Sequence, residues 1–173
     1  MPTRSRTGRL VLAWVLAGLF LVVFLVVGLA GKGASGRVAP ALPRELLSGP
    51  PMTLATLRSA AAGRPSLVVF WASWCEPCQH EAPAVERFAR SPAGHGRVVG
   101  VNWNDEAQSA RHFISRYHWS FSNLRDGEGT VGYAYGLGDL PTTFVIGPDG
   151  RIEKTLVGPQ TEQTLGHALA SAS

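Results

Sequence analysis

Both cysteines of this 173-residue chain lie in one short segment, Trp-Cys-Glu-Pro-Cys at residues 74–78. The segment directly follows the apolar run 66–71, which is rich in Val and aromatic residues and too short for a typical helix. Such a run is typical of a buried strand. A strand, a short turn and two thiols at a helix start give a low-pKa sulfur with a partner in reach. The segment therefore predicts disulfide exchange chemistry.

The spacing of apolar residues predicts the remaining elements. Helices are expected over 53–61, 76–90, 104–117, 131–135 and 161–170, and strands over 66–71, 97–103, 142–146 and 151–157. Gly-Pro-Asp-Gly at 147–150 predicts a hairpin turn, whereas 121–129 is interpreted as irregular. The predicted core residues are Phe70, Val99, Val101, Phe113, Phe144 and Ile146. This order predicts an α/β fold in which the first two strands pair in parallel and helices cover both faces of a mixed sheet.

A second apolar segment, Leu10 to Ala30, holds 21 residues without a charge. As a helix it would be roughly 30 Å long, which matches the hydrocarbon core of a bilayer. Three arginines precede it, so the N-terminus is expected on the cytoplasmic side and the body outside. The alternative is a cleaved signal peptide, but the run exceeds the usual core of such peptides. The predicted organisation is a cytoplasmic N-terminus at 1–9, a transmembrane anchor at 10–30, a Gly/Ala/Pro-rich linker at 31–45 and one domain at 46–173.

The basic character of the chain, with a pI of about 9.6, belongs to the predicted anchor. Five of the sixteen Lys and Arg residues flank the apolar run, so eleven basic residues face all twelve acidic ones from Val38 onward, a net charge of −1. No basic stripe remains in the domain. We therefore expect no nucleic-acid partner.

The two cysteines are expected to have different roles. Cys75 lies at the predicted helix start, where free N–H groups and the helix dipole favour a thiolate, and is the candidate nucleophile. Cys78, one turn later on the same face, is the candidate resolving thiol. Pro77, with its fixed backbone angle, helps to define the loop. The Glu76 carboxylate opposes negative charge on sulfur and so raises the thiol pKa, which favours a protein that acts as a reductant. Glu81 shares the face of Cys78: if buried, it could exchange protons with that thiol, and otherwise it is an ordinary exposed helix residue.

The second candidate site segment surrounds Pro141, directly before the strand 142–146. A cis Leu140–Pro141 bond would turn the backbone toward the cysteine loop, where it could pair with a substrate strand. A trans proline at a strand edge is the more common alternative. The predicted substrate-binding residues are Trp74, Glu76, Pro77, Leu140 and Thr142.

Other chemistries fit less well. A metal site would use the two cysteines with His80 and, as a further ligand, Glu81. A second cysteine pair or a His-x₃-His set is missing, so neither a metal nor another cofactor is predicted. A peroxidase needs an isolated peroxidatic cysteine. A tethered, non-enzymatic binding module is a further alternative, although it would not require two intact cysteines.

Taken together, the motifs resemble the membrane-anchored thioredoxin-like reductases of the TlpA, ResA and CcmG type. The resemblance covers roughly residues 46–169 and rests on Phe-Trp-Ala-Ser-Trp-Cys-Glu-Pro-Cys at 70–78, Gly-Val-Asn at 100–102, Leu-Pro-Thr-Thr-Phe-Val-Ile at 140–146 and Pro-Asp-Gly at 148–150. It implies a thioredoxin fold, Cys75 and Cys78 as the redox pair, Pro141 as a cis-proline facing them, and Glu81 as the family's active-site glutamate.

The resemblance also implies a task. Members of this family typically reduce disulfides outside the cytosol from an anchor in the bacterial inner membrane, most often in apocytochrome c, with electrons from a membrane thiol transporter of the CcdA or DsbD kind. Residues 102–106 are similar to the cytochrome-maturation branch. That branch often has Glu after the cis-proline, where this chain has Thr142. A redox role in assembling the copper site of cytochrome oxidase is an alternative.

Overall fold

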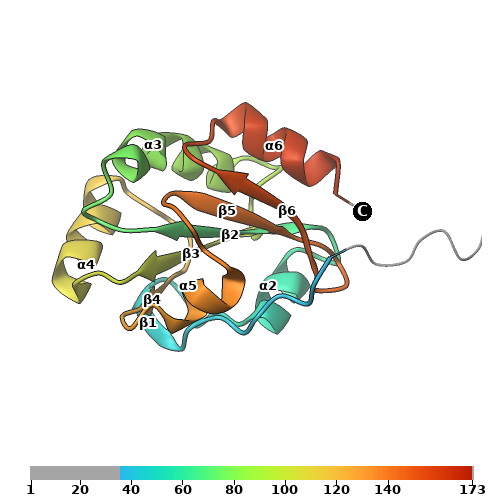
Figure 1. The fold of residues 1–173 in the computed structure, drawn as a ribbon. Coiled ribbons are helices and arrows are strands. Elements are labelled where there is room, and N and C mark those ends of the chain that lie inside the picture. The colour runs from blue at the N-terminus through green and yellow to red at the C-terminus, as the bar shows by residue number, and fades with distance from the viewer. Residues whose placement is uncertain (1–35, 173) are drawn as a thin grey trace, which may run out of the picture. The chain divides into compact units, whose positions relative to one another are not determined.

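The structure, a computed structural model, describes residues 36–172 and contains one six-stranded sheet with helices on both faces (Figure 1). The strands are β1 (Glu45–Ser48), β2 (Ser66–Trp71), β3 (Val98–Trp103), β4 (Asn123–Asp126), β5 (Thr142–Ile146) and β6 (Ile152–Val157). The helices are α2 (Leu54–Ala60), α3 (Glu76–Arg90), α4 (Ala107–Arg116), α5 (Thr130–Tyr135) and α6 (Glu162–Ala170).

The predicted span at 10–30 lies outside the described residues. Within residues 36–172, no helix combines the length and the apolar character needed to cross a bilayer.

Strand β2 lies in the middle of the sheet, whose order is β1-β4-β3-β2-β5-β6. It pairs in parallel with β3, where Val69 faces Gly100, and antiparallel with β5, where Val69 faces Thr143. All six residues of β2 are buried, which explains its continuous apolar sequence. The predicted parallel pairing of the first two strands and the mixed sheet are confirmed.

Alternate residues of β2 contribute to two hydrophobic clusters on opposite faces of the sheet. Val69 and Trp71 pack with α3, α4 and α6, whereas Val68 and Phe70 pack with α2 and α5. Figure 1 shows α3 and α6 on one side of the strands and α2 and α5 on the other. All six predicted core residues are buried. Strand β2 thus lies between two packed layers, and the two cysteines that follow it pack in the cluster of α3, α4 and α6.

Two short strands were not predicted. Strand β4 falls in the stretch 121–129, interpreted as irregular, and β1 falls at the predicted boundary between linker and domain. Strand β4 pairs in parallel with β3, and β1 pairs antiparallel with β4. Each has only four residues, and Asn-Leu-Arg-Asp in β4 has too few apolar positions to give a strand pattern. The neighbouring strand, rather than local propensity, forms them.

The folded body also begins earlier than the predicted boundary at residue 46. Val38 forms a β-bridge with Arg151, and the side chains of Ala39 and Leu42 are buried in the cluster of α2 and α5. The Arg37 guanidinium donates a 2.9 Å hydrogen bond to the carbonyl of Ala134. Residues 37–45, assigned to the linker, therefore contact the domain, because their few apolar side chains find buried positions on it.

Candidate active site

The two cysteines lie at the start of α3 and are joined by a disulfide with an S–S distance of 2.08 Å and a Cα–Cα distance of 5.2 Å. Cys75 is the N-cap of α3, and its Sγ accepts the backbone N–H of Cys78 at 3.2 Å. Both side chains are buried. Glu76 and Pro77, between them, are exposed in the first helical turn, where proline costs no helical hydrogen bond and a carboxylate interacts favourably with the helix dipole.

The loop that precedes the cysteines is held by the buried carboxylate of Asp105, in the loop between β3 and α4. Asp105 Oδ2 accepts the backbone N–H of Ser73 at 2.6 Å and the side-chain amide of Asn102 at 2.8 Å. Asp105 Oδ1 accepts the hydroxyl of Ser73 and the backbone N–H of Glu106, both at 2.8 Å. Four donors thus converge on one carboxylate, which satisfies a buried charge.

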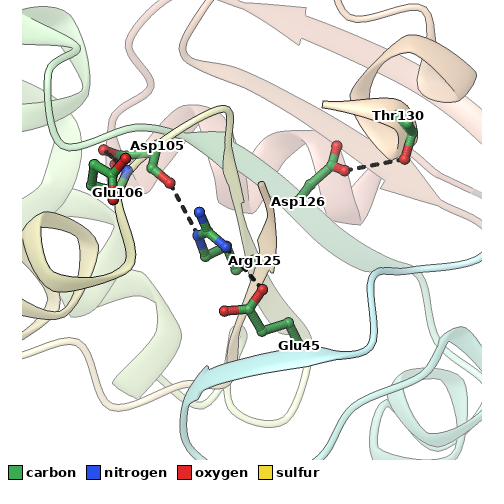
Figure 2. A network of polar contacts seen from close by, with 6 residues as sticks. All are labelled: Glu45, Asp105, Glu106, Arg125, Asp126 and Thr130. Atoms are coloured by element: carbon green, nitrogen blue, oxygen red, sulfur yellow. Dashed lines mark hydrogen bonds and ion pairs between the residues drawn. The ribbon is translucent and has the colours of Figure 1, made fainter. Parts of the chain in front are cut away.

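Arg125, on β4, connects this loop to the edge of the sheet. Figure 2 shows its guanidinium between the backbone carbonyl of Asp105, at 3.0 Å, and the carboxylate of Glu45 on β1, also at 3.0 Å. In the same view, Asp126 lies beside the hydroxyl of Thr130. The two strands missed in the sequence analysis therefore support the loop that carries Asp105.

Glu81 is buried on α3, one turn after Cys78. Burial raises the pKa of its carboxyl from 4.5 to about 7, although the backbone N–H of Gln160, which donates to Oε2 at 2.8 Å, partly opposes this rise. Its other oxygen, Oε1, has no hydrogen-bond partner among the described residues. The open alternative of an exposed helix glutamate is thus resolved: Glu81 is buried in the helix that carries both cysteines and can change protonation near neutral pH.

The Leu140–Pro141 peptide bond is cis. The carbonyl of Pro141 accepts the backbone N–H of Gly158 at 2.9 Å, and the buried Thr142 hydroxyl donates to the carbonyl of Asp139 at 2.7 Å. The resemblance implied a cis bond here, and the structure contains one. Thr142 lies inside the sheet and secures this turn.

A pocket of about 350 Å³ joins the two candidate segments. Of the predicted site residues it brings together Trp74, Cys75, Glu76, Pro77 and Leu140. Cys78, Glu81, Pro141 and Thr142 do not line it. The remaining lining residues are Trp103, Leu137, Gly138 and Asp139. Of the two cysteines, the pocket thus borders Cys75 and not Cys78.

Residues 35–169 match the sequence profile of the family described as Redoxin. The chain belongs to the Redoxin family. It is 31% identical to the thiol:disulfide interchange protein HelX of Rhodobacter capsulatus, over 85% of this chain and 90% of that protein. It is 29% identical to the thiol-disulfide oxidoreductase ResA of Bacillus subtilis, over 88% of each. The solved structure of StoA from Bacillus subtilis superposes with a TM-score of 0.64 at 26% identity, covering 75% of this chain and 96% of that one.

Together with the Cys-x-x-Cys pair, this membership identifies a thioredoxin-like thiol-disulfide oxidoreductase of the ResA and CcmG type. The predicted thioredoxin-like α/β fold of the domain and the predicted enzyme class are confirmed.

Sequence reasoning missed several residues of this Redoxin-family site. Both Asp105 and Trp103 fall in the segment 102–106 noted for its family similarity, but neither was given a role in the site. In the structure, Asp105 holds the cysteine loop and Trp103 lines the pocket. A signal existed, because β2 and β3 are parallel and their carboxyl ends meet at one edge of the sheet. Gln160 carried no such signal, since its backbone reaches Glu81 from the far end of the chain.

Proposed function

We propose that the chain is a membrane-anchored protein-disulfide reductase that acts outside the cytosol, with apocytochrome c as its client. The observations that carry the proposal are that Cys75 borders the pocket and that Glu81 is buried one helical turn after Cys78. The pKa of the Glu81 carboxyl, about 7, suits proton transfer. The relatives are named as thiol:disulfide interchange and thiol-disulfide oxidoreductase proteins, which supports a protein disulfide as the substrate.

The exchange begins with the dithiol form. The Cys75 thiolate attacks one sulfur of the client disulfide, so a Cys75–client bond forms, the client S–S bond breaks, and the second client sulfur leaves as a thiolate that takes up a proton. The Cys78 thiolate then attacks Cys75 Sγ and releases the first client sulfur. Two electrons pass to the client, which becomes a dithiol, while Cys75 and Cys78 become the disulfide.

Glu81 serves the second step in this proposal. Cys78 is buried and does not line the pocket, so its proton needs an acceptor inside the protein. The carboxylate of Glu81, one helical turn away on the same face, is that acceptor. Leu140, which precedes the cis-proline Pro141, lines the pocket together with Cys75, and the client backbone would lie beside it.

The anchor and the electron donor belong to the same proposal. The uncharged run 10–30, preceded by three arginines, supports a single span in the bacterial inner membrane with residues 1–9 in the cytoplasm and the domain in the periplasm or outside the cell. Regeneration of the dithiol requires two electrons from another dithiol. The resemblance to the ResA and CcmG type supports a membrane thiol transporter of the CcdA or DsbD kind.

The test is to express the full-length Cys78→Ser variant in cells and isolate its mixed disulfides. With the second step blocked, Cys75 should remain bonded to its client, identified by mass spectrometry as apocytochrome c. The Cys75→Ser variant is the matched control and should capture nothing. Equal capture by both variants, or no capture by either, contradicts the mechanism, whereas capture of other clients contradicts only the assignment of apocytochrome c.

A further inference from the structure

Three aromatic side chains form a continuous row beside the pocket, which we call the aromatic rim: Trp74, Trp103 and Tyr133. The ring centroids are 6.5 Å apart between Trp74 and Trp103, and 6.0 Å apart between Trp103 and Tyr133. Trp74 is 57% exposed and Tyr133 is 70% exposed. Both therefore present large apolar surfaces to solvent, and adjacent exposed aromatics of this kind are characteristic of binding surfaces.

The indoles of the rim are fixed before any client binds. The Trp74 indole N–H donates to the carbonyl of Asn104 at 3.1 Å, and the Trp103 indole N–H donates to the carbonyl of Gly129 at 3.1 Å. Trp103 also lies against Gly132 of α5, where an added Cβ would come within 2.4 Å of its indole. A side chain held by both a hydrogen bond and close packing loses little entropy on binding, so the Trp103 indole at the centre of the rim is preorganised.

The rim continues into the active-site pocket, because two of its members, Trp74 and Trp103, also line that pocket. At about 350 Å³ the pocket is more than twice the size of a cavity of ~150 Å³ that holds benzene. Leu137 and Leu140 add apolar surface, and Glu76 and Asp139 place two exposed carboxylates at its border. No basic residue of the described chain lines it. The surface is thus aromatic and acidic, next to Cys75.

We propose that the aromatic rim selects polypeptide clients in which the disulfide attacked by Cys75 is flanked by an aromatic side chain and a basic side chain. The inference rests on the proposed function and names the feature that its client must carry. The aromatic side chain lies in the pocket against Trp103, and the basic side chain lies beside Glu76 and Asp139. A small disulfide at Cys75 would leave Tyr133 and most of the rim uncovered, so the surface fits a polypeptide.

The test compares short synthetic peptides, each closed by one disulfide, as oxidants of the reduced full-length protein in detergent. One peptide carries Trp and Lys beside the cysteines, a second carries Ala and Lys, and a third carries Trp and Glu. Hydroxyethyl disulfide, which carries neither an aromatic nor a basic side chain, reports the reactivity of Cys75 itself. The readout is kcat/KM for each peptide relative to the rate constant with hydroxyethyl disulfide.

We expect the Trp–Lys peptide to exceed the Ala–Lys peptide by about threefold to tenfold in this ratio, as for one aromatic contact. Tyr133→Ala and Trp103→Ala should each remove most of that preference, and Trp103→Phe should retain part of it. The advantage of Lys over Glu should shrink at high salt. Val157→Ala, an exposed apolar residue on β6, is the control and should keep the full preference.

Equal ratios for the three peptides, or a preference that survives in full in both Tyr133→Ala and Trp103→Ala, would overturn the rim proposal. Tyr133 is largely exposed, so its variant keeps the test valid if a substitution of Trp103 unfolds the protein. A lack of reaction with hydroxyethyl disulfide would instead contradict the exchange chemistry of Cys75. The two failures are therefore distinguishable.

Discussion

The carboxyl of Glu81 on α3 accepts the backbone N–H of Gln160 at 2.8 Å and is otherwise enclosed by the core. This contact joins the helix that carries both cysteines to the turn between β6 and α6, 79 residues later in the chain. Because one hydrogen bond does not replace the lost hydration of a carboxylate, the pKa of Glu81 lies at about 7.

The first prediction concerns the stability of the oxidised protein. The Glu81 pKa is about 7 in the folded state against 4.5 ordinarily, so between these pH values the folded state binds the extra proton. The stabilising contribution is complete below about pH 4.5 and is lost as the pH rises through about 7, by about 3 kcal/mol in all. Glu81→Gln should remove this slope from the free energy of unfolding, measured by denaturant titration at successive pH values.

The matched control for that measurement is Glu162→Gln, which changes an exposed carboxylate on α6. Its stability should keep the pH dependence of the unchanged protein. An identical slope in Glu81→Gln and in the unchanged protein would show that Glu81 ionises in its ordinary range.

The second prediction concerns the rate of exchange. If Glu81 accepts the proton of Cys78, the resolution of a mixed disulfide at Cys75 should accelerate with an apparent pKa near 7. Glu81→Gln should slow this step by about 100-fold and abolish its acceleration in that range. Stopped-flow measurement of leaving-thiol release after rapid formation of the mixed disulfide separates it from the first attack. A fall confined to the first attack would assign Glu81 a different role.

The third prediction concerns Asp105, whose two oxygens accept four donors. Asp105→Asn places an amide group opposite donors from Ser73, Asn102 or Glu106, because an amide provides one accepting oxygen and not two. We expect a loss of about 1–3 kcal/mol in the free energy of unfolding. We also expect slower attack by Cys75, since Ser73 lies two residues before it. Denaturant titration and the rate with hydroxyethyl disulfide measure the two effects.

The control for Asp105 is Arg125→Lys, which keeps the charge but loses the Nε donor to the Asp105 carbonyl. Arg125→Lys should lower the free energy of unfolding and the rate of attack by Cys75 by less than Asp105→Asn does, because all four hydrogen bonds to the Asp105 carboxylate remain. A larger effect of Arg125→Lys on the rate would place the support for the cysteine loop in β4 rather than in Asp105.

These residues also mark what the sequence could predict. Strand β2 and the cysteine helix were predicted with their observed bounds, because burial on both faces and a proline in the first turn leave local signals. Strand β4 was missed because its residues become a strand only through pairing with β3. The support of Ser73 by Asp105 was missed for a related reason. The contact spans 32 residues, and only the parallel placement of β2 and β3 brings the two loops together.

The burial of Glu81 shows the same limit. Its spacing from Cys78 placed Glu81 on the same helical face as that cysteine, but spacing alone does not show whether the face is buried or exposed. Helix α6 packs against α3 and thereby buries this face of the helix. Local periodicity therefore identified the chemical groups, whereas their environment depended on elements distant in sequence.

The last prediction concerns Gly132 on α5, which allows the Trp103 indole to lie against the helix backbone. In Gly132→Ala the added methyl would come within 2.4 Å of Trp103 Cδ1 and Nε1, so the indole must leave its position. We expect a loss of about 1–3 kcal/mol in stability from this overpacking. We also expect the preference for the Trp–Lys peptide to fall as it does in Trp103→Ala.

Gly166→Ala on α6 is the matched control, because its added methyl would meet only Phe88, at 3.9 Å, an ordinary contact distance. There alanine should stabilise the protein by about 0.5–1 kcal/mol through its higher helix propensity, and the peptide preference should be retained. Denaturant titration and the peptide assay, applied to both variants, distinguish an effect on stability from an effect on client recognition by the rim. If Gly132→Ala kept the full preference for the aromatic peptide, the position of the Trp103 indole would not determine recognition.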